Sequence, residues 1–193
     1  LAGEDAPREP VSEGFERRHY EWEHNRLGLS DEVMPPFTPM AVRDTTVSCV
    51  LREHRHGATG LWDSLVSEGH ELLAAPLRWE VETAAGVATV EGAGWHATRQ
   101  TPTGVAGEAR WQAGGLKAVT RTEYDVDGMM RVTLALDAAP ATDVHRLSLV
   151  IPLRDDECRY LHGCGDGLRH NAAGFVPAGE GVVWDSSKGN KLE

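Results

Sequence analysis

The chain has 193 residues, of which 40% are hydrophobic and 25% are charged, the proportions of an ordinary globular protein. Its formal net charge of −11, with no basic stripe to offset it, argues against nucleic acid and anionic membranes as partners. No apolar run reaches the ~18 residues that a membrane-spanning helix needs. Three cysteines, an odd number, do not suggest a disulfide framework, although a bond between Cys158 and Cys164 stays open.

The N-terminal part of the sequence predicts a leader followed by a helix. Residues 1–14 are rich in Ala, Gly, Glu and Pro, a composition typical of a flexible segment. Aromatic and polar residues then recur at intervals of three and four, which predicts a helix over Phe15–Leu27 that ends at Gly28. Three prolines between residues 35 and 39 require an extended path after the helix.

From Ala41 onward apolar residues alternate with polar ones, which is the period of a half-buried strand. The clearest alternation predicts three inward-pointing residues, Leu77, Trp79 and Val81. Gly92 and Gly94 interrupt a later strand and predict a bulge. Asp127 and Gly128 predict a two-residue turn between two long strands.

The stretch TTVSCVLREHRHG is predicted as one strand with two different faces. Val47, Cys49 and Leu51 lie on one face of this strand, and His54 and His56 lie on the other. Because the two histidines are two residues apart, they point the same way. They are either half of a metal site or part of a solvated strand end.

These segments amount to eight or nine strands without an alternation of strands and helices. The sequence therefore predicts an all-β protein, an antiparallel β-sandwich of the galactose-binding or supersandwich kind, with one N-terminal helix. Residues 15–187 are predicted to form this single domain, and residues 188–193 a tail or the start of a missing segment. Within the domain, glycine-rich residues 155–181 are predicted to be mostly loop, and residues 181–186 a last short strand.

A glycine-rich segment, HGCGDGLRH at residues 162–170, carries side chains that bind metals or ligands. Its metal-ligand types are His162, Cys164, Asp166 and His170. Their spacing fits no known zinc motif, so no metal is predicted. The alternatives are a loop with scattered polar residues and a loop that contacts a ligand. In the second case glycine permits close approach, while His162, Arg169 and His170 donate hydrogen bonds.

Two acidic pairs, Asp31-Glu32 and Asp156-Glu157, offer the two carboxylates that sugar hydrolysis needs. Each pair lies in a predicted loop, where solvated acidic residues are common, so neither pair is predicted to be catalytic. The sequence contains no motif for a serine or cysteine nucleophile, for a dinucleotide or for a phosphate-binding loop. No cofactor is therefore predicted.

Six tryptophans, against three phenylalanines and three tyrosines, are an unusual aromatic composition. The flat indole ring stacks well on the C–H face of a sugar. Trp79 and Trp111 are predicted to lie in the core. Trp95 and Trp184, which have Gly or Asp neighbours, are predicted to be more open and to be candidates for contact with a sugar.

Seven motifs are informative in combination: WEHNRLGL at 22–29, PPFTP at 35–39, ELLAAP at 71–76, EYDVDGMMRV at 123–132, LVIPL at 149–153, LHGCG at 161–165 and GVVWDS at 181–186. In their order and spacing they resemble the N-terminal β-sandwich region of bacterial glycoside hydrolases related to the β-N-acetylgalactosaminidase family. The resemblance spans roughly residues 20–187, nearly the whole chain.

In that family the sandwich precedes a (β/α)-barrel whose C-terminal face carries the catalytic Asp-Glu pair. Because this sequence has no such barrel, the resemblance implies a noncatalytic domain that supports a missing barrel and lines its glycan cleft. Its partners are then the rest of its own polypeptide and a glycan. The residues predicted to contact a ligand are His162, Arg169, His170 and Trp184. The alternatives are a free-standing carbohydrate-binding module and a structural or adhesion sandwich.

Overall fold

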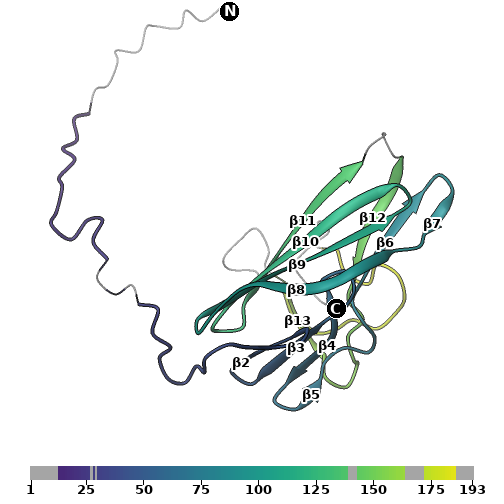
Figure 1. The fold of residues 1–193 in the computed structure, drawn as a ribbon, viewed down its shortest axis with the longest axis horizontal. Coiled ribbons are helices and arrows are strands. Elements are labelled where there is room, and N and C mark those ends of the chain that lie inside the picture. Colours follow the sequence, from purple (N-terminus) through teal and green to yellow (C-terminus); the bar gives the residue numbers. More distant parts are fainter. Residues whose placement is uncertain (1–12, 27, 29, 139–142, 164–171, 186–193) are drawn as a thin grey trace, which may run out of the picture. The chain divides into compact units, whose positions relative to one another are not determined.

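The computed structural model describes residues 13–26, 28, 30–138, 143–163 and 172–185 (Figure 1). The chain divides into two compact units, Leu1–Ser30 and Asp31–Glu193. The described residues contain strands and turns but no helix, and so no helix that could cross a membrane.

The first unit lacks the helix predicted over Phe15–Leu27. Its described residues are irregular, with turns at Glu21–His24 and at Gly28, and Tyr20 stacks on Trp22 with ring centroids 5.1 Å apart. Phe15 is 92% exposed and Trp22 is 67% exposed. A helix of about 13 residues is marginal in water unless other parts of the protein cover its apolar stripe. The described residues of this unit supply no such cover, so the helix prediction is wrong.

The second unit contains four sheets among its described residues. The five-stranded sheet has the order β1-β2-β3-β4-β5, with strands at Ala41–Arg43, Thr46–Cys49, Arg52–His56, Trp62–Ser67 and His70–Glu71. The four-stranded sheet has the order β11-β10-β9-β8, with β8 at Glu91–Thr101, β9 at Gly104–Ala113, β10 at Leu116–Asp125 and β11 at Met130–Ala138.

The other two sheets are smaller. The three-stranded sheet has the order β12-β6-β7, with β6 at Arg78–Thr83, β7 at Gly86–Ala88 and β12 at Val144–Val150. A hairpin joins β13 at Tyr160–Gly163 to β14 at Ala172–Phe175. Every pair of neighbouring strands is antiparallel, which confirms the prediction of an all-β antiparallel fold.

The four-stranded sheet has one buried face and one exposed face. Buried and exposed residues alternate along most of β9 and β10 because successive side chains of a strand point to opposite faces. The inward residues of these two strands are Val105, Gly107, Ala109, Trp111, Ala113, Leu116, Ala118, Thr120, Thr122 and Tyr124. The outward residues are mostly charged or polar, so this sheet can face water on one side.

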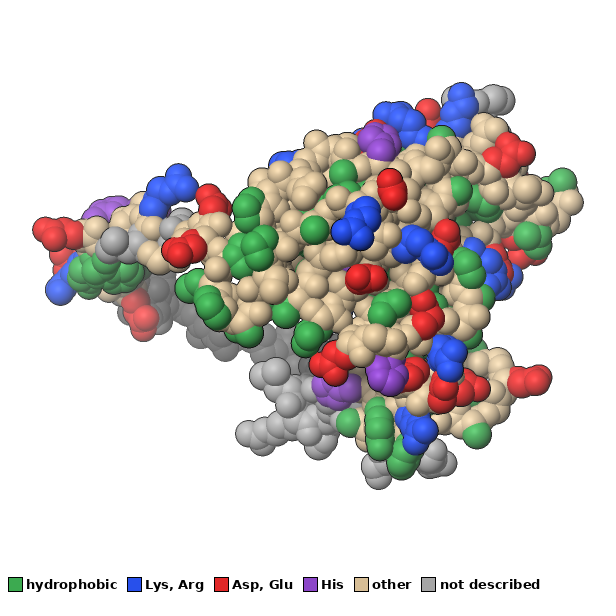
Figure 2. Space-filling view, turned by 60° about the horizontal axis from the view of Figure 1, so that its bottom comes forward, with side chains coloured by type: hydrophobic (Ala, Val, Ile, Leu, Met, Phe, Trp, Pro, Cys, Tyr) green, Lys and Arg blue, Asp and Glu red, His purple; other side chains and the backbone are tan. Residues whose placement is uncertain are grey.

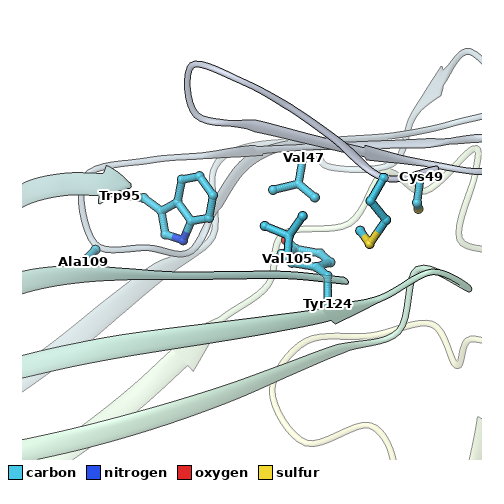
Figure 3. Packing of buried hydrophobic residues seen from close by; sticks show 7 residues of the cluster. Val47, Cys49, Trp95, Val105, Ala109 and Tyr124 are labelled. Carbon is cyan, nitrogen blue, oxygen red and sulfur yellow. The ribbon is translucent and has the colours of Figure 1, made fainter. Parts of the chain in front are cut away.

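The five-stranded and three-stranded sheets together cover the inward face of the four-stranded sheet. At one end, Val47 and Cys49 of the five-stranded sheet pack against Val105 and Tyr124 (Figure 3). At the other end, Val81 of the three-stranded sheet belongs to a cluster with residues of β9 and β10. A third cluster, of Leu61, Leu73 and Leu77, includes the partly buried Trp62 and Trp79 from the two covering sheets. The inward positions predicted for Leu77, Trp79 and Val81 agree with these clusters.

The predicted long strand around the two histidines is instead a hairpin. The chain turns between Cys49 and Arg52, where Leu51 has a positive φ of 60° and is 63% exposed. This reversal pairs Val47 with His54 on opposing strands. Directly opposed residues of an antiparallel pair share a face, so the histidine lies on the buried side with Val47. The turn thus reverses the face predicted for both histidines.

The bulge and the turn predicted from glycine residues are present, whereas the strand and the loop predicted near the C-terminal end are not as expected. The bulge near Gly92 and Gly94 is present, as a register shift between Gly92 and Trp95. A turn is also present at Asp127-Gly128, with a φ of 83° at the glycine. It is a loop of three residues instead of the predicted two, because the Asp125 N–H donates to the Met129 carbonyl oxygen and leaves residues 126–128 between the strands. By contrast, the predicted strand at residues 181–186 is absent from its described part, and the segment predicted as loop contains the β13–β14 hairpin.

Trp95 packs directly over a glycine of the neighbouring strand. Its indole N–H donates a hydrogen bond of 2.9 Å to the Thr122 hydroxyl, and the residue is 4% exposed. A Cβ placed on Gly107 would lie 2.2 Å from an indole carbon of Trp95. The core therefore needs a residue without a side chain at position 107. The prediction that Trp95 is open is wrong, because the bulge in β8 turns this residue inward.

We expect Gly107→Ala to destabilise the protein by about 1–3 kcal/mol, because the added methyl group must displace a buried ring that cannot move without losing its hydrogen bond. Urea unfolding followed by tryptophan fluorescence measures this change. Gly14→Ala is the matched control, since a Cβ at that position meets nothing within 4 Å. Equal stability of the two variants would show that Trp95 has room to move.

Candidate functional site

Three side chains from two sheets form a buried chain of hydrogen bonds. The Trp62 indole N–H donates to the Tyr124 hydroxyl at 2.6 Å, and this hydroxyl lies 2.8 Å from His56 Nε2. On the other side of the imidazole ring, His56 Nδ1 lies 2.8 Å from the carbonyl oxygen of Gly60. Because a carbonyl oxygen can only accept, Nδ1 carries the proton and Nε2 accepts from Tyr124. The chain is therefore satisfied when His56 is neutral.

Burial also favours the neutral form of both histidines of β3. His54 and His56 are 1% and 3% exposed. Loss of hydration lowers the pKa of each to about 4, although a backbone hydrogen bond to each ring acts in the opposite direction. His56 also stacks on Trp95 with ring centroids 4.3 Å apart. These histidines are core residues, and the prediction of a solvated strand end is wrong.

The described residues do not bring together three side chains of His, Cys, Asp or Glu that could hold a metal ion.

Both carboxylates of the acidic pair at residues 156 and 157 contact a basic side chain. Asp156 accepts hydrogen bonds from the Arg154 guanidinium at 3.1 and 2.6 Å, which lower the pKa of its exposed carboxyl group. Glu157 Oε1 lies 3.0 Å from His70 Nδ1. Cys158 is a free thiol.

Of the four residues predicted to contact a ligand, only His162 and Trp184 lie within the described residues; Arg169 and His170 lie outside them. His162 is an exposed residue of β13. Trp184 is half-buried, and a Cβ on Gly163 would lie 2.6 Å from its ring. Since residues 162 and 163 point to opposite faces of the hairpin, the structure does not bring His162 and Trp184 to one surface.

The β13–β14 hairpin instead presents an aromatic pair beside His162. Tyr160 and Phe175 are directly opposed in the strand register, and their rings stack with centroids 5.0 Å apart. They remain 74% and 70% exposed. His162 and its partner Ala173 are the next opposed pair on the same face. We call Tyr160, His162 and Phe175 the hairpin face.

Neither aromatic residue of the hairpin face stands out in the sequence. The segment between them is rich in glycine, which is typical of a loop, and the two residues are far apart along the chain. The only local signal is that Tyr160 and His162 are two residues apart, the spacing of neighbours on one face of a strand. The pairing of Tyr160 with Phe175 depends on the closure of the hairpin.

A comparison of the sequence with models of protein families assigns the chain to a known group. The model of the family described as "Glycoside hydrolase 123, third domain" matches residues 40–192. The chain belongs to this family. No curated protein matches the chain significantly. The glycoside hydrolase 123 match begins immediately before β1 and includes the hairpin face.

Membership in glycoside hydrolase 123 agrees with the resemblance to glycoside hydrolases related to the β-N-acetylgalactosaminidase family. The family description places this domain third, whereas the resemblance implied an N-terminal position. The seven motifs therefore identified the kind of protein, and the family match gives the position of the domain within it.

The buried histidines of this glycoside hydrolase 123 domain predict a loss of stability in mild acid. A histidine has a pKa of about 6.5 when unfolded, and His54 and His56 have a pKa of about 4 in the folded state. The unfolded chain therefore binds more protons between these two values. We expect the free energy of unfolding to be highest above pH 6.5 and to fall towards pH 4, by on the order of 3 kcal/mol per histidine.

Urea unfolding at a series of pH values measures this dependence. His54→Phe should flatten the dependence, because it removes one of the two buried groups that bind a proton only after unfolding. His96→Ala, at an exposed position of β8, is the control and should leave the profile unchanged. A free energy of unfolding that stays constant from pH 6.5 to pH 4 would contradict the assignment of neutral buried histidines.

Proposed function

We propose that this chain is a noncatalytic accessory domain of a glycoside hydrolase, folded as a β-sandwich, and that its hairpin face docks on the rest of the same polypeptide. The docking partner is the (β/α)-barrel implied by the resemblance. The stacked, exposed pair of Tyr160 and Phe175 is the observation that carries this proposal. The family description supports it, because a third domain belongs to a protein with other domains.

The packing of the sheets supports the sandwich. The four-stranded sheet buries one face against the five-stranded and three-stranded sheets and keeps its other face exposed. Two antiparallel layers with a shared apolar core are the usual solution for such sheets. Asp156 and Glu157 support a noncatalytic role, since Arg154 and His70 occupy their carboxylates.

The chemistry of the hairpin face favours a protein partner. Two aromatic rings that remain about three-quarters exposed leave a large apolar area in water, which is typical of an interaction surface. The same segment of the chain exposes further aliphatic side chains, with Val176 at 49% and Val182 at 81%. Charged groups of both signs are scattered over the visible surface, with apolar side chains between them (Figure 2). Aromatic anchors within a polar surround are common at protein interfaces.

The double variant Tyr160→Ser, Phe175→Ser tests the docking. In the polypeptide that contains the barrel, hydrogen exchange of the amides in β13 and β14 should be slower than in the isolated chain, because docking covers the hairpin. We expect the double variant to remove this protection and to increase cleavage by protease between the domains. Val87→Ser is the control, since Val87 is 74% exposed on β7 but lies outside the hairpin.

The same variants separate docking from glycan binding. If the isolated wild-type chain binds neutral oligosaccharides and the double variant does not, the hairpin face is a sugar platform and the carbohydrate-binding module is the better description. If amide exchange in β13 and β14 is the same in the isolated chain and in the longer polypeptide, the hairpin face is not the docking surface.

A further inference from the structure

The exposed face of the four-stranded sheet contains a groove that crosses all four strands. The strand register aligns one outward row of residues across β8, β9, β10 and β11, namely Glu91, Gln112, Lys117 and Asp137. A second outward row contains Arg110, Val119 and Ala135. Between the rows lies the main chain of residues whose side chains point away, such as Trp111 and Ala118. This groove has a volume of about 570 Å³.

The groove has the size of a ligand site and continues beyond these two rows. Binding clefts for small ligands usually measure about 300–1,000 Å³. A second depression of about 310 Å³ at the Gly114–Gly115 turn shares Glu91, Gln112 and Lys117 with the groove. The β8 bulge between Gly92 and Trp95 lies at one end of the groove. Bulges often occur next to functional sites, where they redirect a strand.

The polar side chains of the groove are balanced in charge. Glu91 and Asp137 are acceptors, Arg110 and Lys117 are cationic donors, and the charges of these four groups sum to zero. One nitrogen of Arg110 is already hydrogen-bonded to Glu108 at 3.3 Å. Gln112 donates a hydrogen bond of 3.1 Å to Glu91. Lys117 and Asp137 are directly opposed in the register, but the described residues place no ion-pair partner within 4.0 Å of either one. Their hydrogen-bonding groups are therefore available to a ligand.

We propose that this groove binds a neutral, polyhydroxylated chain, that is, a segment of glycan laid across the four strands. Hydroxyl groups can both donate and accept, so they match a row of alternating acceptors and donors without a net charge. The small side chains of Ala93, Val119 and Ala135 leave space for the C–H faces of the sugar rings. An anionic ligand gains no net attraction from a balanced groove on a chain with a net charge of −11.

The fold holds this groove in a fixed shape without a ligand. The inward residues of the same strands form the rigid core, so the positions of Arg110, Gln112 and Lys117 follow from strand register. A backbone that is already in place reduces the entropy lost on binding. The groove and the hairpin face are on different elements, so this inference does not depend on the docking of the hairpin.

The test uses the whole 193-residue chain and two neutral probes, cellotetraose and chitotetraose. We expect amide chemical shifts of Gln112, Lys117 and Asp137 to change on titration, with a Kd of about 1 mM for at least one probe. The double variant Gln112→Ala, Lys117→Ala should weaken that binding about tenfold. Both side chains are exposed, and thermal unfolding should confirm that the double variant remains folded.

The control is the double variant Glu123→Ala, Arg131→Ala, which removes an ion pair from the same exposed face. Position 123 is six residues from Lys117 along β10, about 20 Å at the rise of an antiparallel strand. The affinity of this control variant for the probes should equal that of the unchanged chain. Three outcomes overturn the inference. The amide chemical shifts do not change at up to about 10 mM probe, or the groove variant binds the probe as tightly as the unchanged chain does. The third is that an acidic trisaccharide of galacturonic acid binds more tightly than either neutral probe.

Discussion

The buried hydrogen-bond chain from Trp62 through Tyr124 to His56 is the constraint on which the rest of the structure depends. It joins β4 and β3 of the five-stranded sheet to β10 of the four-stranded sheet in the middle of an apolar core. A polar group left unpaired there would cost about 1–3 kcal/mol, so the two sheets are held in the one relative position that satisfies all three side chains. Hydrophobic burial alone does not define a position so narrowly, because it has no direction.

The same core explains how the two surfaces of the four-stranded sheet became different. Once Val105, Trp111 and Tyr124 point inward, the alternation of the strand forces Arg110 and Gln112 outward. Two threonines accept hydrogen bonds from the buried indole groups of Trp95 and Trp111, which satisfies these two N–H groups within the four-stranded sheet. The outward face takes no part in this core and carries the groove.

The two proposed surfaces differ in their chemistry and in the kind of partner that each is proposed to bind. The hairpin face is apolar and aromatic, as expected of a contact between parts of one polypeptide. The groove combines a mostly apolar lining with side chains whose charges balance, as expected of a site for a neutral glycan. A glycoside hydrolase that acts on a polymer gains effective concentration when a second domain holds the same chain. The domain then needs no catalytic group of its own.

The sequence by itself determined the all-β class, the bulge after Gly92, the turn at Asp127-Gly128 and the inward positions of Leu77 and Val81. These features depend on the alternation of neighbouring residues and on the conformational freedom of glycine, which are local. The resemblance to glycoside hydrolases was also recoverable from the order of short motifs.

Only the tertiary structure decided the rest. One turn at Leu51 moved His54 and His56 from a predicted solvated face into the core, and the closure of the hairpin brought Phe175 to Tyr160. The N-terminal helix failed because periodicity shows an apolar stripe but not whether anything covers it. The groove is likewise invisible in the sequence, because Glu91, Gln112, Lys117 and Asp137 become neighbours only through the register of four paired strands.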